Sequence, residues 1–115
     1  MEVVMGRHVV INVFTVTPEH QQELVELATK SISGTGTRQP GFVSGTVHRS
    51  SDGVRVANVI EWESEEAWHR AHAANRGVNP EFDAHMARVH EISQPDPHIY
   101  EVAFSTSTQA GAVAG

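Results

Sequence analysis

The sequence predicts an α+β domain of the ferredoxin-like class, with a split β-α-β-β-α-β order and helices on one face of a four-stranded antiparallel sheet. Three observations lead to this prediction. The chain has 115 residues, which is the size of one domain. Runs rich in β-branched residues alternate with stretches whose apolar residues recur at helical spacing. A turn signal that contains Asp52-Gly53 joins the second run to the third, as in a β-hairpin.

Four strands are predicted from the positions of β-branched and aromatic residues. They occupy His8–Val16, Phe42–Arg49, Val54–Trp62 and Ile99–Ser105. The domain therefore covers residues 8–105. Residues 106–115 are small and weakly patterned, and we expect them to form a flexible C-terminal tail.

Each predicted helix begins with a capping residue that is followed by proline or acidic residues. These starts are Thr17-Pro18-Glu19, Ser64-Glu65-Glu66 and Asn79-Pro80-Glu81. Apolar residues recur at helical spacing behind each start. The three helices are expected to end near Gly34-Thr35-Gly36, Gly77 and Gln94-Pro95, respectively.

The predicted first strand is apolar on both of its faces. One face holds Val9, Ile11 and Val13, and the other holds Val10, Phe14 and Val16. A strand that is apolar on both faces is usually buried on both, but the helices of this fold cover only one face of the sheet. We therefore expect a homodimer in which two copies of the chain pack sheet against sheet.

Composition excludes several classes of partner. The net charge is −6 and the eight Lys and Arg residues are scattered, so we expect no nucleic-acid partner. Cysteine is absent, which excludes disulfides, thiolate nucleophiles and Cys-based metal sites. No apolar run reaches the roughly 18 residues that a membrane helix needs, and the first seven residues do not resemble a signal peptide. We expect a cytoplasmic protein without membrane contact.

The eight histidines suggest a metal site only weakly. His69 and His72 have helical ligand spacing, and Glu65 lies one turn before His69. A two-His, one-carboxylate iron site would need all three side chains on one face. This stretch has the pattern of a solvated surface, so we expect no metal.

The predicted third strand carries an amide on an otherwise apolar face. Asn58 shares this face with Val56, Ile60 and Trp62. An amide in such a place costs roughly 1–3 kcal/mol unless it is hydrogen-bonded. Either Asn58 is bonded to backbone or buried water, or it lines a ligand pocket. The indole N–H of Trp62 also needs an acceptor when it is buried, and together the two groups would suit an aromatic, oxygen-rich ligand.

Further candidates lie on the second and third predicted helices. Trp68 and His72 are one turn apart and face the same way, so they either form an amphipathic boundary or line a pocket beside Trp62. On the third helix, His85 shares an apolar face with Phe82 and Met86. A histidine on an apolar face is either a hydrogen-bonded core residue or, beside a pocket, a proton acceptor.

The segment Asn58-Val-Ile-Glu-Trp62-Glu-Ser-Glu-Glu-Ala-Trp68 resembles the antibiotic biosynthesis monooxygenase family of small α+β-barrel dimers. Leu24-Val-Glu-Leu-Ala28, Gln39-Pro-Gly-Phe42 and the hairpin that follows fit the same pattern, so the resemblance covers residues 8–105. It implies a ferredoxin-like fold and a dimeric α+β barrel. It also implies oxidation of a phenolic polyketide to a quinone by dioxygen, with neither metal nor flavin as cofactor.

The resemblance also implies roles for the candidate residues. The ionised substrate reduces dioxygen itself, so the protein has to hold the ring and stabilise the anion and the peroxide. On this interpretation Asn58 and Trp62 donate hydrogen bonds to the substrate oxygen or the peroxide, and His72 or His85 relays protons. The side chains expected to bind the aromatic substrate are those of Asn12, Trp68, Phe82 and Met86.

Two departures and two alternatives accompany this interpretation. Trp68 stands where a family member has a tyrosine. That relative also has an arginine on its last helix, and Arg88 is one of several residues near the corresponding position. A haem-degrading branch of the superfamily uses an Asn, a Trp and a His, which Asn12 and His85 match in part. Ala71 stands near the expected Trp, which counts against haem. The other alternative is a dimeric domain that binds an aromatic metabolite without turnover.

Overall fold

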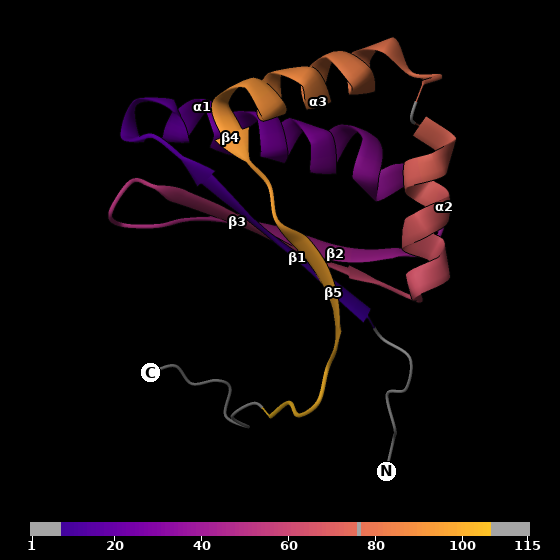
Figure 1. The fold of residues 1–115 in the computed structure, drawn as a ribbon. Helices are drawn as coiled ribbons and strands as arrows, with labels where there is room; N and C mark the ends of the chain where they lie inside the picture. Colours follow the sequence, from indigo (N-terminus) through magenta and orange to yellow (C-terminus); the bar gives the residue numbers. More distant parts are fainter. Residues whose placement is uncertain (1–7, 76, 107–115) are drawn as a thin grey trace.

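The computed structural model describes residues 8–75 and 77–106, and in it helices cover one face of an antiparallel sheet (Figure 1). The predicted ferredoxin-like order of elements is confirmed. Apart from residue 106, the expected C-terminal tail lies outside the described residues, as do the first seven residues. The elements are β1 (His8–Val16), α1 (Pro18–Lys30), β2 (Phe42–Arg49), β3 (Arg55–Trp62), α2 (Glu65–Asn75), α3 (Pro80–Ile92), β4 (Ser93–Gln94) and β5 (Pro97–Glu101).

The prediction of one last strand over Ile99–Ser105 in a four-stranded sheet is wrong. Within the described residues the sheet has five strands in the order β2-β3-β1-β4, and β5 also pairs with β1. β4 pairs with the end of β1 and β5 with its first half, so two short strands share one edge of β1. The split has a physical cause, because Pro95 and Pro97 lack the N–H that an uninterrupted ladder would need.

The register of β1 against β3 determines which side chains face the helices. Antiparallel pairing sets Asn12 opposite Asn58 and Phe14 opposite Val56. Phe14 and Val56 are buried in a core cluster with Leu24 of α1. Because side chains alternate along a strand, the amides of Asn12 and Asn58 lie on this same helix-covered face.

The starts of α2 and α3 follow the predicted capping pattern, whereas the start of α1 does not. Ser64 Oγ accepts a hydrogen bond from the Ala67 N–H (3.0 Å), and the Asn79 side chain accepts from two N–H groups in the first turn of α3. The hydroxyl of Thr17 is instead hydrogen-bonded to Nδ1 of His20 (3.1 Å) and caps no backbone group. α1 still begins at Pro18, whose ring fixes a φ suited to a first helical residue.

The end of α1 is irregular. The α-helix stops at Lys30 and continues as a π-helical turn, Ser31–Thr35, and a 3₁₀ turn, Gly36–Arg38. The α-helix therefore ends four residues before Gly34-Thr35-Gly36, where its end was predicted, and these residues lie in the π-helical and 3₁₀ turns. Glycine lowers helix stability, and π-turns within helices are frequent near functional sites.

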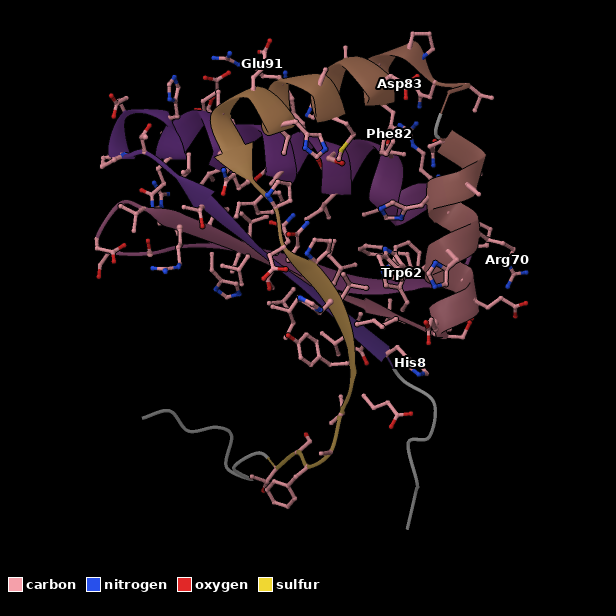
Figure 2. All side chains as sticks on the ribbon, in the orientation of Figure 1. His8, Trp62, Arg70, Phe82, Asp83 and Glu91 are labelled. Carbon is pink, nitrogen blue, oxygen red and sulfur yellow. The ribbon has the colours of Figure 1, made fainter. Side chains whose placement is uncertain are left out.

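The side chains divide the molecule into an apolar interlayer and a charged exterior. Figure 2 shows Arg70, Asp83 and Glu91 on the outer surfaces of the helices, and all three are exposed. Trp62 lies between α2 and the sheet and is 4% exposed. None of the described helices is long and apolar enough to span a membrane.

Gly41 makes the turn that leads into β2. Its φ is +89°, and a Cβ at this position would lie 2.5 Å from the Cβ of Ala67 on α2. Its carbonyl accepts a hydrogen bond from the Glu63 N–H (2.8 Å), which ties this turn to the end of β3. Both the left-handed backbone and the contact with α2 require glycine.

We expect Gly41→Ala to lower the free energy of unfolding by about 1–3 kcal/mol, because the new Cβ strains the backbone and collides with Ala67. Gly34→Ala is the matched control: nothing lies within 4 Å of its Cβ position, and its effect should stay within about 1 kcal/mol. Urea unfolding followed by tryptophan fluorescence measures both. Equal stability of the two variants would contradict this description of the turn.

Candidate active site

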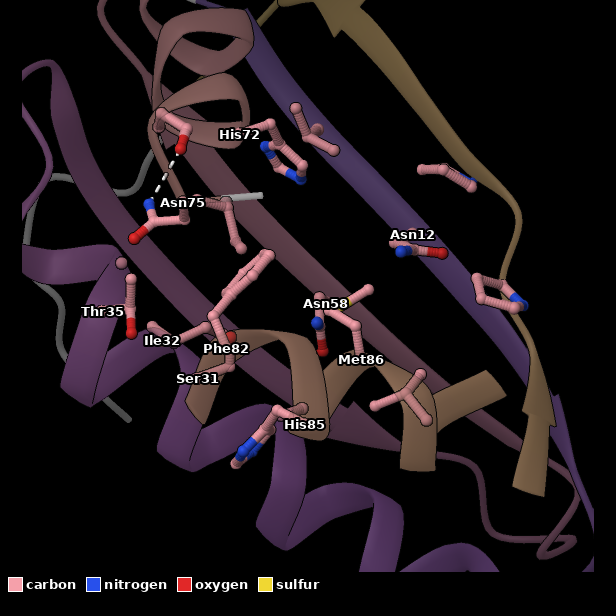
Figure 3. A pocket seen from close by; sticks show the side chains of 18 of the residues that line it. Asn12, Ser31, Ile32, Thr35, Asn58, His72, Asn75, Phe82, His85 and Met86 are labelled. Carbon is pink, nitrogen blue, oxygen red and sulfur yellow. Dashed lines mark hydrogen bonds between the residues drawn. The ribbon is translucent and has the colours of Figure 1, made fainter. Parts of the chain in front are cut away.

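A cavity of about 600 Å³ lies between the sheet and the helices (Figure 3). Its walls come from β1, β3, all three α-helices, the π-helical turn and the connection between β4 and β5. Most of the lining side chains are apolar. This volume is typical of a cavity that encloses a small organic ligand, for which the range is roughly 300–1,000 Å³.

The structure brings the candidate residues from the sequence together around this one cavity. The strands contribute amide and indole groups, α2 contributes an indole and an imidazole, and α3 contributes the remaining side chains. Their roles stay predictions at this point. The residues are Asn12, Asn58, Trp62, Trp68, His72, Phe82, His85 and Met86.

Two polar atoms of cavity-lining residues are buried without a hydrogen-bond partner among the described residues. They are Oδ1 of Asn58 and Nε1 of Trp62. An unpaired buried polar atom costs about 1–3 kcal/mol, and native proteins leave few of them. The two atoms are an acceptor and a donor on one face of β3, so a ligand with a hydroxyl and a carbonyl could pair with both.

Aromatic contacts hold the indole of Trp62 and shape the wall above it. Phe42 packs edge-on against Trp62, with ring centroids 5.7 Å apart. On α2 the rings of Trp68 and His72 are 5.3 Å apart in a T-shaped arrangement. The two indoles therefore lie on opposite layers of the same cavity.

His72 projects from α2 toward the cavity (Figure 3). Its Nδ1 is hydrogen-bonded to the carbonyl of Trp68 (3.4 Å). A carbonyl can only accept, so Nδ1 is the donor in this bond. A neutral imidazole in the cavity wall can accept a proton.

His85 has a different orientation. Its Nε2 donates to the carbonyl of Leu27 on α1 at 2.8 Å, and Figure 3 shows the ring directed at α1. This bond joins α3 to α1 and leaves only Nδ1 for proton exchange. Because Nε2 of His85 is hydrogen-bonded to α1, this ring is not placed as a haem ligand. The haem-degrading branch also has a tryptophan near the position of Ala71, and Ala71, which is buried, adds no aromatic ring to the cavity.

Arg88 points away from the cavity. Its Nε and Nη2 donate to the carboxylate of Glu23 (2.7 and 2.9 Å), and Nη1 donates to Glu91 (3.0 Å). The hydrogen bonds from Arg88, and then its positive charge, hold the pKa of Glu23 below its usual value. The hydrogen bonds to Glu23 and then to Glu91 raise the pKa of Arg88. Arg88 therefore joins the outer surfaces of α1 and α3 and does not take the place of a catalytic arginine.

The described cavity lining contains no Lys, Arg, Asp or Glu. Its ionisable side chains are four histidines, which are His69, His72, His85 and His90. A negative charge that develops on a ligand here must be stabilised by neutral N–H donors and by imidazole.

Comparison with known proteins agrees with this geometry. Residues 7–91 match the protein family described as antibiotic biosynthesis monooxygenase. The chain belongs to this family. Like the family members named below, it is a monooxygenase and hence an oxidoreductase. The resemblance inferred from the sequence around Asn58 and Trp62 is confirmed.

Several family members are similar over most of the chain. Tetracenomycin-F1 monooxygenase of Streptomyces glaucescens is 36% identical over 95 residues, which are 83% of this chain and 80% of that protein. A monooxygenase from the gene ActVA-Orf6 of Streptomyces coelicolor, solved with nanaomycin D, has a TM-score of 0.72 and 28% identity; the match covers 89% of this chain and 92% of that one. SnoaB of Streptomyces nogalater, a cofactor-independent oxygenase, has the same fold, with a TM-score of 0.67 and 22% identity over 87% and 96% of the two chains.

Sequence reasoning missed several lining residues. They are those of the π-helical turn, together with Gln39, Pro95 and Pro97. His69, which lies in the stretch predicted to be solvated, and His90 are exposed but also border the cavity. No local signal indicates these positions, because they depend on how α1 unwinds and on how the chain returns along β1. Among residues 8–75 and 77–106 no three metal-binding side chains cluster.

We expect Asn58→Leu to leave the free energy of unfolding unchanged or to raise it by up to about 1 kcal/mol. It removes an unpaired buried oxygen at nearly constant volume. Asn75→Leu is the matched control at the same cavity, since it breaks the bond from Asn75 Nδ2 to the Ala71 carbonyl (2.8 Å) and should cost about 1 kcal/mol. Urea unfolding measures both. A loss of about 2 kcal/mol in Asn58→Leu would mean that Asn58 has a structural partner.

Proposed function

We propose that this family member is a cofactor-independent monooxygenase that oxidises a phenolic, anthrone-type polycyclic compound to a quinone with dioxygen. The observation that carries the proposal is the pair of unpartnered buried atoms, Asn58 Oδ1 and Trp62 Nε1, in residues that line an apolar cavity. The relatives named for tetracenomycin F1 and solved with nanaomycin D support a substrate of an antibiotic pathway.

The electron balance supports a reaction without a cofactor. A base removes a proton from the acidic ring carbon, and the resulting delocalised anion transfers electrons to dioxygen. A C–O bond forms and gives a hydroperoxide. Loss of the second proton from that carbon breaks the O–O bond, which leaves a carbonyl on the ring and releases water. Dioxygen takes up four electrons in total, and the substrate supplies all of them.

The cavity residues have distinct parts in this scheme. The Asn58 amide donates through Nδ2 to the substrate oxygen or the peroxide and accepts through Oδ1 from a substrate hydroxyl, and the Trp62 N–H donates to a second substrate oxygen. Asn12 also binds the substrate. The apolar side chains hold the ring system between sheet and helices, which brings the reacting carbon and dioxygen together. These ring-binding side chains are those of Trp68, Phe82 and Met86.

We assign the proton transfer to His72 in preference to His85. The ring of His72 is directed at the cavity (Figure 3), so it can take a proton from the substrate and return it. The ring of His85 is instead bonded across to α1. His85 can contribute only through Nδ1, as a secondary group.

We further propose that a second copy of the chain covers the outer face of the sheet. Val9, Ile11 and Val13 form a half-buried apolar row on that face, with Val59 opposite Ile11 on β3. Tyr100, which pairs with Val9, is 47% exposed. Contiguous apolar surface of this kind is typical of an interface between protein chains.

The activity test is oxygen uptake and quinone absorbance with anthrone. We expect one dioxygen per quinone, with no effect of a chelator and no need for flavin. Asn58→Ala and Trp62→Phe should each lower kcat/KM by about 10–100-fold, because each removes a hydrogen bond to a developing charge. Arg88→Ala, outside the cavity, is the control and should keep wild-type kinetics. Full turnover in Asn58→Ala, or dependence on added metal or flavin, would refute the proposal.

The dimer test is light scattering at micromolar concentration. We expect the mass of two 12.5 kDa chains, and we expect Ile11→Glu to give a monomer by placing a charge in the apolar row. Val78→Glu is the control, because Val78 is 71% exposed and lies in the connection between α2 and α3. A wild-type protein that is monomeric under these conditions would overturn the dimer proposal.

A further inference from the structure

We infer that the π-helical turn at the end of α1 forms a second polar subsite, in which the hydroxyls of Ser31 and Thr35 bind an uncharged oxygen substituent of the substrate. The inference rests on the proposed function. Both side chains line the cavity. Figure 3 shows them on one side of it and Asn12 on the other, with Asn58 between them. The subsite therefore contacts the end of a polycyclic substrate that lies away from Asn12.

The hydroxyl residues of this segment divide into two pairs. Ser33 and Thr37 are exposed, and each hydroxyl donates to the carbonyl four residues earlier, at 2.8 Å for Ser33 and 3.1 Å for Thr37. Hydroxyls in helices commonly satisfy themselves in this way. Ser31 and Thr35 are half-buried, and neither of their hydroxyls has a hydrogen-bond partner among the described residues. The pair that lines the cavity is therefore the pair left open for a ligand.

Hydrogen bonds to the backbone hold both residues in place. The Ser31 N–H donates to the carbonyl of Leu27. The same carbonyl accepts from Nε2 of His85 at 2.8 Å, which ties this part of α1 to α3. The carbonyl of Thr35 accepts from Nε2 of Gln39 at 3.3 Å. Groups that are fixed before binding lose less entropy when a ligand arrives, so the two hydroxyls are preorganised for it.

The chemistry of this wall selects the group that binds there. A hydroxyl both donates and accepts, so it pairs with a phenolic hydroxyl or with a carbonyl on the ring. The described lining has no Lys or Arg, so a carboxylate or phosphate would lose its hydration without gaining a counter-charge. Ile32 and Phe82 also line the cavity and offer apolar contact to the ring itself. The subsite therefore favours outer rings that carry a hydroxyl or carbonyl over unsubstituted ones.

The test removes each pair of hydroxyls separately. The inner variant combines Ser31→Ala with Thr35→Val, and the outer control combines Ser33→Ala with Thr37→Val, which deletes the same groups from the exposed side. The probes are anthraquinone, whose outer rings carry no substituent, and a dihydroxyanthraquinone with a hydroxyl on each outer ring. Tryptophan fluorescence measures Kd. We expect the inner variant to raise Kd about tenfold for the dihydroxy compound and at most about twofold for anthraquinone, because only the former loses hydrogen bonds to the turn.

The outer control should change neither Kd by more than about twofold, and urea unfolding shows that each variant is folded. If the inner variant does not fold, Ser31→Ala is compared with Ser33→Ala by the same criterion. No loss of affinity in the inner variant, an equal loss for both probes, or the same loss in the outer control would overturn the inference, as would a wild type that binds neither probe.

Oxygen uptake with anthrone tests the proposed function separately. If wild type oxidises no anthrone, the proposed function fails, and a loss of affinity confined to the inner variant and the dihydroxy compound still supports the subsite. If wild type oxidises anthrone and the inner variant shows no such selective loss, the inference fails and the proposed function stands.

Discussion

The antiparallel register between β1 and β3 is the constraint on which the rest of the site depends. It sets Asn12 opposite Asn58 and places both on the face beneath the helices. A slip of one residue would turn every side chain of a strand to the other face, which would move the amides outside and an apolar row inside. Buried Phe14 and Val56, which pair in the same register, make such a slip costly.

This register gives the cavity polar groups but no fixed charge. The described lining offers amides, an indole N–H and imidazoles. On the proposed function, such a cavity binds a neutral aromatic compound more readily than an acid and stabilises the anion only once it has formed on the ring. Because the stabilisation arises in the reacting state more than in the bound substrate, it is of the kind that accelerates a reaction.

Much of the fold could be predicted from local patterns, whereas the edges of the site could not. The bounds of β1 and β2, and the position of Asn58 and Trp62 on the face of β3 that lines the cavity, follow from alternation along a strand. The predicted last strand differs from β4 and β5 of the structure, because the position of these strands depends on pairing with β1 around two prolines. The orientation of His85 depends on Leu27, 58 positions away in the chain. The orientation of such a side chain depends on packing against residues that are distant in the sequence, so no local sequence pattern predicts it.

The most direct test of the central claim is the indole N–H signal of Trp62 in a two-dimensional ¹H–¹⁵N NMR spectrum. The chain has only two tryptophans, so Trp62→Phe assigns both indole signals. On titration with a hydroxyanthraquinone, we expect the Trp62 signal to move downfield and its exchange with solvent to slow, as its N–H gains an acceptor. A Trp62 signal that stays in place while the compound binds would contradict the claim that this cavity pairs a substrate oxygen with Trp62.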